Sequence, residues 1–167
     1  MNDDRSDHDP DPVPAVPAPT PQPTPAPEPE PESYDGIIQS VRGKGKLKGT
    51  RFADAFTFDS FDVFTKKAAN KIIGFDASEG DSIAISKEAF PALVGTSEIS
   101  FISTKKKKEL KVLSQQDYDF VYFSKKGKLY FDGNGVDLDW GGANDGGLVA
   151  VLKGKPELSA GDFTLLA

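Results

Sequence analysis

The chain has 167 residues, no cysteine, one histidine and a formal net charge of −6. The lack of cysteine excludes disulfides, thiolate metal sites and a cysteine nucleophile, and no run approaches the ~20 apolar residues that span a bilayer. Residues 1–35 carry nine acids and one base, whereas residues 36–167 carry 17 acids and 19 bases, so the negative charge belongs to the first segment.

Residues 1–35 are predicted to be a disordered, acidic, proline-rich tail. This segment holds 11 of the 13 prolines, and its few Ala and Val residues offset too little of the roughly 1–2 kcal/mol of backbone entropy per residue. Alternating prolines favour extended polyproline II, which suits a spacer and also suits a ligand for a proline-reading protein partner. No basic stretch or apolar h-region opens the chain, so we expect no N-terminal secretory signal of the usual kind.

Residues 36–48 are predicted to be a linker, and residues 49–167 are long enough for one domain with a core. Alternation of apolar with small or polar residues predicts strands at 55–59 and 83–85. Between them, helical spacing of apolar side chains predicts a short helix or turn over 61–70, and the apolar run 72–75 predicts a buried strand.

The second half of the chain continues the β pattern. A short helix capped by Ser86 is predicted over 87–93, and another strand at 99–101. The lysine run 105–108 is predicted to be a solvated turn. Residues 120–131 read as a hairpin with Gly127 in the left-handed position, and 148–152 as a buried strand. We therefore expect a mainly β fold, an antiparallel sandwich or a roll cap, with two or three short helices after the disordered tail.

Two stretches, GTRFADAFTF at 49–58 and NKIIGFDASEGDSI at 70–83, precede an ordered series of aromatic, glycine and acidic residues in the second half. That series is Phe123, Gly127, Leu129–Phe131, Asn134, Gly135, Gly146, Gly147, Leu158, Asp162 and Phe163. Together these stretches resemble the C-terminal, post-repeat module of RTX (repeats-in-toxin), or hemolysin-type calcium-binding, proteins, many of them cyanobacterial. The resemblance covers roughly residues 49–167.

The resemblance implies an all-β module that caps a calcium-bound β-roll and is exported by a type I (ATP-binding cassette) secretion apparatus. That apparatus reads an uncleaved C-terminal signal, so the protein would be secreted. In the family the signal often ends in an acid followed by apolar residues. The matching residues here are Asp162, Phe163, Thr164, Leu165, Leu166 and Ala167.

Folding would give the same terminal segment a second role. Once the domain has folded, Phe163 and Leu165 are expected to pack beside the strand at 148–152. The family's tandem calcium nonapeptide has no copy in this chain, so we expect the cap without the roll.

A polar cluster lies between the hairpin and the last buried strand. Oxygen ligands at close spacing suit a hard cation such as calcium. The spacing does not match the twelve-residue EF-hand loop, and the same residue types are those that tight turns use, so turn chemistry and a weak calcium site both fit the sequence. The candidate calcium ligands are Asp132, Asn134, Asp137 and Asp139, with Asp145 nearby.

No set of catalytic residues stands out, and we expect no enzyme. The only histidine, His8, lies in the tail, and nothing in the sequence pairs two carboxylates. Basic runs at 42–51 and 105–111 suit phosphates, but the near-neutral body and the acidic tail argue against a nucleic-acid partner. Trp140 either covers a core edge or is an exposed aromatic for a ligand. The alternative function is a cytoplasmic protein-interaction module that binds through the proline-rich arm.

Overall fold

The computed structural model describes residues 36–39, of which 37–39 by backbone only, together with residues 44–60 and 63–167. The predicted tail, residues 1–35, and the first two residues of the predicted helix 61–70 lie outside the described residues. The chain divides into two units, and the second, Ser33–Ala167, holds every described residue.

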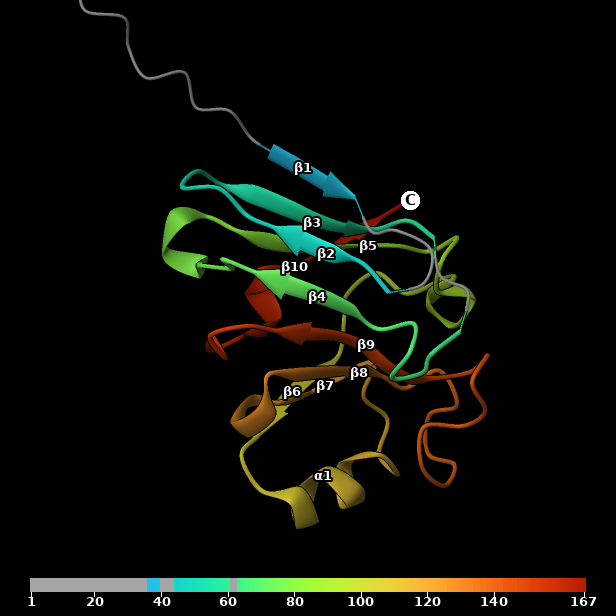
Figure 1. The fold of residues 1–167 in the computed structure, drawn as a ribbon. Helices are drawn as coiled ribbons and strands as arrows, with labels where there is room; N and C mark the ends of the chain where they lie inside the picture. The colour runs from blue at the N-terminus through green and yellow to red at the C-terminus, as the bar shows by residue number, and fades with distance from the viewer. Residues whose placement is uncertain (1–35, 40–43, 61–62) are drawn as a thin grey trace, which may run out of the picture. The chain divides into compact units, whose positions relative to one another are not determined.

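The described part is largely β, with ten strands in two sheets and one α-helix (Figure 1). The first sheet has the order β1-β3-β5-β10 and the second β2-β4-β9-β8-β7-β6. The strands are β1 (Gly36–Gln39), β2 (Lys46–Lys48), β3 (Asp54–Phe58), β4 (Asn70–Ile73), β5 (Ser82–Ser86), β6 (Phe101–Thr104), β7 (Phe120–Phe123), β8 (Lys128–Phe131), β9 (Gly147–Leu152) and β10 (Phe163–Leu166). The helical elements are α1 (Lys107–Leu113) and the single 3-10 turns η1 (Ala77–Glu79), η2 (Pro91–Leu93), η3 (Ser124–Lys126) and η4 (Ala160–Asp162).

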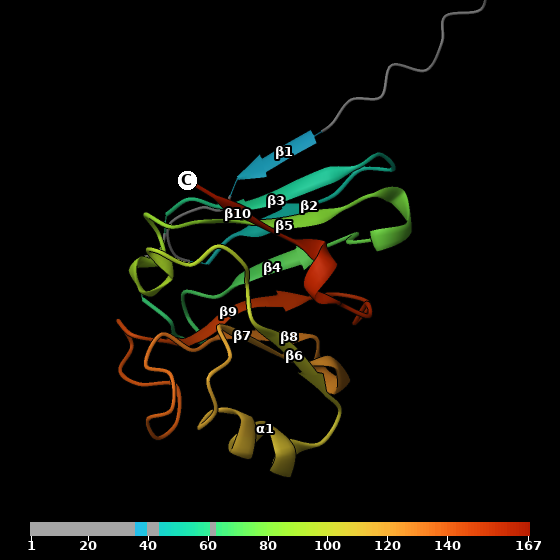
Figure 2. The same ribbon diagram turned by 180° about the vertical axis from the view of Figure 1, so that it is seen from behind.

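Strands β1 to β5 alternate between the two sheets, so this part of the chain winds as a parallel two-sheet coil. Strands β1, β3 and β5 pair in parallel in the first sheet, and β2 and β4 pair in parallel in the second. After an insertion that carries β6 to β8, strand β9 returns beside β4 and β10 returns beside β5, again in parallel. Figure 2 shows the same coil from behind.

The predicted antiparallel fold is wrong for this coil. Six of the eight described pairings are parallel, and only β7 with β8 and β8 with β9 are antiparallel. The reason is topological, because a chain that crosses to the other sheet after each strand returns to the first sheet in its original direction. Strands β1 and β2 occupy part of the predicted linker 36–48 and pair with β3 and β4, so the coil begins before residue 49.

Most strands lie where the alternation predicted them. The strands at 55–59, 83–85 and 148–152 are confirmed as β3, β5 and β9, and the hairpin 120–131 as β7 and β8. Gly127 has a φ of 64° between them. In the segment 61–70, predicted as a short helix or turn, residues 66–68 form a turn. In the predicted helix 87–93, residues 87–89 form a turn and only 91–93 are helical, as η2. The prediction of a turn at the lysine run is wrong, because this run leads into α1.

The core between the sheets is unusually aromatic. The rings of Phe90 and Phe131 meet edge to face with centroids 4.8 Å apart, and each fully buried aromatic side chain contributes about 1.5–3 kcal/mol of hydrophobic stabilisation. The terminal strand joins this core, since Phe163 lies 5.0 Å from Phe101 and 5.4 Å from Phe120 between ring centroids. Strand β10 pairs with β5 in the first sheet, and Phe163 packs against the core cluster to which residues of β9 also belong.

Buried carboxylates hold the turns that lead into successive coil strands. Asp81 accepts the backbone N–H of Asp54 at 2.9 Å and that of Asp76 at 2.8 Å. Asp54, the first residue of β3, accepts the backbone N–H of Thr50 and, at 3.0 Å, its hydroxyl. Asp54 and Asp81 are 1% and 4% exposed. Each carboxylate thus fixes the turn before its own strand, and Asp81 also reaches the preceding strand of the same sheet.

Replacing Asp81 by alanine is expected to lower the free energy of unfolding by about 2–5 kcal/mol, because two backbone N–H groups lose their acceptor. Chemical denaturation followed by far-ultraviolet circular dichroism measures the change. Glu79→Ala, an exposed acid on the same turn, is the matched control and should be nearly neutral. Equal effects of the two substitutions would contradict the structural role of Asp81.

Candidate functional site

The loop 132–146, which joins β8 to β9, holds all the predicted calcium ligands. Asp132 is 4% exposed and accepts the backbone N–H groups of Asn134 and Gly135. The Asn134 side chain donates to the Asp132 carboxylate and accepts the N–H of Gly141 at 3.1 Å, in the amide orientation that satisfies both groups. The structure therefore brings Asp132 and Asn134 into contact, and their hydrogen bonds connect the beginning of the loop with Gly141.

Asp137 and Asp139 lie on the exposed part of the same loop. Asp139 has a φ of 58°, a conformation that Asp tolerates in turns. Among the described residues, no three His, Cys, Asp or Glu side chains are grouped so that they could hold a metal ion. Turn chemistry thus accounts for the observed contacts, and calcium at this loop stays a prediction.

The glycine pair that opens β9 is required by close backbone packing. A Cβ on Gly147 would lie 2.5 Å from the carbonyl oxygen of Phe64, and the φ of Gly147 is +135°. A Cβ on Gly146 would lie 2.7 Å from the carbonyl oxygen of Phe131. The return of the chain into the second sheet therefore depends on two residues without side chains.

The Asp132 carboxyl is electrostatically unfavourable as an anion. Its Oδ2 atom is buried and has no hydrogen-bond partner, and the carboxylates of Asp117 and Asp119 repel it. Burial, with these charges, raises the pKa of Asp132 to about 7 against the counteracting backbone hydrogen bonds. Burial also raises the pKa of Asp119. The group thus changes charge near neutral pH.

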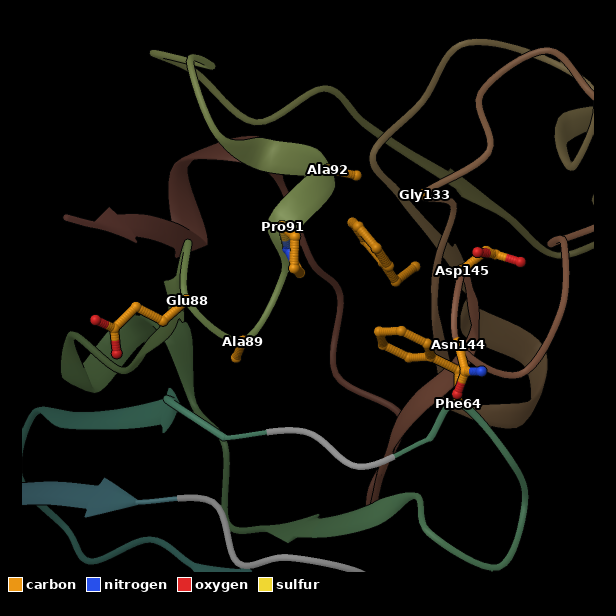
Figure 3. A pocket seen from close by; sticks show the side chains of 9 residues that line it. Phe64, Glu88, Ala89, Pro91, Ala92, Gly133, Asn144 and Asp145 are labelled. Atoms are coloured by element: carbon orange, nitrogen blue, oxygen red, sulfur yellow. The ribbon is translucent and has the colours of Figure 1, made fainter.

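A pocket of about 310 Å³ lies where the loop approaches the segment before and within η2 (Figure 3). The rings of Phe64 and Phe131, with centroids 5.3 Å apart, form part of its lining. Figure 3 shows Glu88 and Asp145 on opposite sides of the pocket, and Asp145 also accepts the N–H of Gly142 at 2.9 Å. The described lining residues combine phenylalanine rings with acidic side chains and include no basic residue that could pair with them as acid and base.

Sequence reasoning missed this pocket. Phe64 lies in the segment predicted as a short helix or turn, and η2 and the 132–146 loop are far apart in the chain, so no local pattern joins them. The only signal was the clustering of turn residues at 132–145, which marks a long loop without showing what the loop covers.

The six residues of the predicted secretion signal form the end of the first sheet. The carboxylate of Asp162 accepts the N–H and the hydroxyl of Ser159, at 2.7 and 3.1 Å, which caps η4. Phe163 and Leu165 pack partly against the core, whereas Thr164 and Ala167 are exposed. The segment is thus an edge strand with one packed face and one open face.

Trp140 stacks on Tyr130, with ring centroids 4.9 Å apart and an interplanar angle of 12°. Both side chains are half-buried, so Trp140 covers part of β8 and keeps some surface in solvent. Tyr122 is different, because it is fully buried and its hydroxyl donates to the carbonyl oxygen of Pro156 at 2.9 Å. Burial raises the pKa of Tyr122 to about 12.

The chain matches no family model, no curated protein and no solved structure. Among the described residues, no helix has the length and apolar character that crossing a membrane requires. The case for a function therefore depends on the geometry of the coil, its terminal strand and its surface.

The pKa of Asp132 predicts a pH-dependent stability. Because the pKa rises from 3.8 to about 7 on folding, the folded state binds more protons than the unfolded state between about pH 4 and pH 7. The free energy of unfolding should therefore fall as pH rises through this interval. Three pH units correspond to about 4 kcal/mol, and screening by nearby solvent reduces the expected loss to about 1–3 kcal/mol.

Asp132→Asn should remove most of this dependence, because the amide does not titrate. Urea unfolding at about pH 5 and about pH 8 measures it, and Asp137→Asn, an exposed acid of the same loop, is the control. If the substitution at Asp132 leaves the pH profile unchanged, this carboxyl does not carry the effect.

The same variants test the calcium prediction. At a pH above the pKa of Asp132, where its carboxylate is charged, a calcium ion held by Asp132 and Asn134 would raise the unfolding temperature of the unsubstituted protein. Calcium would leave the unfolding temperature of the Asp132→Asn variant unchanged. Differential scanning calorimetry with and without calcium chloride measures the shift. No shift at millimolar calcium would assign the loop to turn chemistry alone.

Proposed function

We propose that this chain is a non-catalytic, secreted, RTX-like module, exported by a type I apparatus that reads residues Asp162–Ala167. The observation that supports this proposal best is the parallel coil that ends in an edge strand. The RTX resemblance implies a module attached to a parallel β-roll, and a parallel two-sheet coil suits such a module better than an antiparallel sandwich does. Calcium at Asp132 and Asn134 would be an accessory to this role.

The placement of β10 supports a terminal signal. Phe163 pairs with Ile83, 80 residues earlier in the chain. Contacts between residues so far apart carry a large entropic cost of chain closure and depend on earlier folding of the coil. In an unfolded chain the terminal segment therefore has no local partner and is accessible to a transporter, and after export it completes the first sheet.

The way the buried acids are used favours a non-catalytic module. Asp54 and Asp81 accept backbone hydrogen bonds at the beginnings of strands, and Asp132 accepts them within its loop. Carboxylates held in this way stabilise turns, and they do not converge on a common position where a substrate atom would react.

Blocking the chain end without disturbing β10 gives the sharpest test of export. Deleting the six terminal residues would also remove Phe163 from the core, so loss of export would have two explanations. Ala167 is exposed and follows β10, so a short polar tag fused after it should leave the fold intact. We expect the tagged protein to remain in cells that carry the type I transporter, whereas the untagged protein reaches the medium.

The matched control carries the same tag before Met1 and should be exported normally. Thermal unfolding of both purified proteins must agree, so that a folding defect does not imitate a lost signal. Equal export of the two tagged proteins, or export without the transporter, would rule out the terminal signal. Retention of every form inside cells would favour the cytoplasmic interaction module.

A further inference from the structure

A row of lysines crosses the second sheet near the beginning of the coil. Strands β2, β4, β9 and β8 lie side by side in that order (Figure 1). Lys46 pairs with Lys71, Lys71 with Val151, and Val151 with Lys128. Directly paired residues point to the same side of a sheet, so these four side chains share one face.

The row points away from the core. The residues that follow the lysines along each strand are Leu47, Ile72 and Leu129, which are 3%, 0% and 0% exposed. Because successive side chains alternate between the two faces, the lysines lie on the outer face. Lys48 joins them from β2, two residues after Lys46. We call Lys46, Lys48, Lys71 and Lys128 the lysine face.

The lysine face has no neutralising partner on its own strands. Strands β2, β4, β8 and β9 contain no Asp or Glu. Within the part of the chain that the structure describes, none of the four lysines forms an ion pair. Neighbouring strands are only about 4.8 Å apart, and like charges directly opposite each other destabilise a sheet. A bound polyanion would remove this repulsion.

One aliphatic and two aromatic side chains accompany the charge. Val151 lies between Lys71 and Lys128 in the row and is half-buried. Tyr130 follows Lys128 by two residues on the same strand, so it lies on the same face, and Trp140 stacks on it. The surface thus combines spaced cations with one aliphatic side chain and one aromatic stack.

We propose that the lysine face binds a linear acidic polysaccharide. Carboxylate or sulfate groups of the polymer would pair with the lysines, and its sugar rings would lie on Val151 and the Tyr130–Trp140 stack. A lysine ammonium is a compact point charge without the bidentate fork of arginine, so the face recognises charge density rather than one headgroup. The proposal rests on the proposed function for its location, because an exported protein meets the polysaccharides outside the cell.

The chemistry of the face favours a polysaccharide over the other polyanions. Proteins that bind single strands of nucleic acid present aromatic platforms to successive bases, whereas this face has a single aromatic stack. Membrane binding requires apolar side chains that insert between lipids. The large hydrophobic side chains that are most exposed among the described residues, Val94, Val112, Val136 and Leu138, all lie outside strands β2, β4, β8 and β9.

The test compares two triple variants of the full chain that have equal charge. Lys46→Gln, Lys71→Gln and Lys128→Gln neutralise the face, whereas Lys106→Gln, Lys108→Gln and Lys111→Gln neutralise exposed lysines at α1. Binding of polygalacturonate and of heparin is measured by titration calorimetry at about 50 and about 200 mM salt. An oligothymidylate and vesicles that contain phosphatidylglycerol serve as probes of the other two classes.

We expect the face variant to bind polysaccharide at least about tenfold more weakly than the unsubstituted protein, the α1 variant to bind almost normally, and added salt to weaken binding. Equal losses in the two variants, or no binding at the lower salt, would overturn the proposal. Tighter binding of the oligonucleotide or the vesicles would assign the face to that class instead. Because the assay uses purified protein, it is independent of whether the terminal strand directs export.

Discussion

The coil depends on the carboxylates that hold its turns. A chain that alternates between two sheets must reverse direction after every strand, and each reversal leaves backbone N–H groups without a ladder partner. Asp81 supplies an acceptor to the turn before β5 and to the first residue of β3. Asp54 supplies the acceptor for the turn that precedes its own strand. Without these buried acceptors, the N–H groups would cost about 1–3 kcal/mol each, a large share of the stability of a domain this size.

The sequence predicted the strands more reliably than their partners. Alternation at 55–59 and 83–85 marks side chains that face a core, but it carries no information about strand direction, so the parallel pairing of β3 with β5 was missed. The aromatic hairpin was predicted correctly because its pairing is local and Gly127 marks its turn. The partner of β10 was missed for the opposite reason, since Ile83 and Phe163 are joined only through the completed coil.

In the candidate site, too, local features were predicted from the sequence and contacts between distant residues were not. Clustering of Asp and Asn predicted that Asp132 and Asn134 belong to one polar loop, and the structure places them in contact. No sequence pattern indicates that Asp132 is buried with Asp117 and Asp119 nearby, because these residues approach only through the pairing of β7 with β8. The helix α1 was missed because four consecutive lysines read as solvent-exposed, which they are, and exposure does not distinguish a helix from a turn.

The lysine face could not be predicted from the net charge, because net charge does not show how charges are distributed over the surface. Residues 36–167 are close to neutral, and a near-neutral body argues against polyanions only if the charges are mixed on its surface. The register instead places Lys46 opposite Lys71 and keeps acids off the neighbouring strands. Repulsion between these lysines weakens the pairing of β2 with β4, the first strand pair of the second sheet. A polyanion bound there would therefore strengthen the start of the coil, so ligand binding and the stability of the first turn are thermodynamically linked.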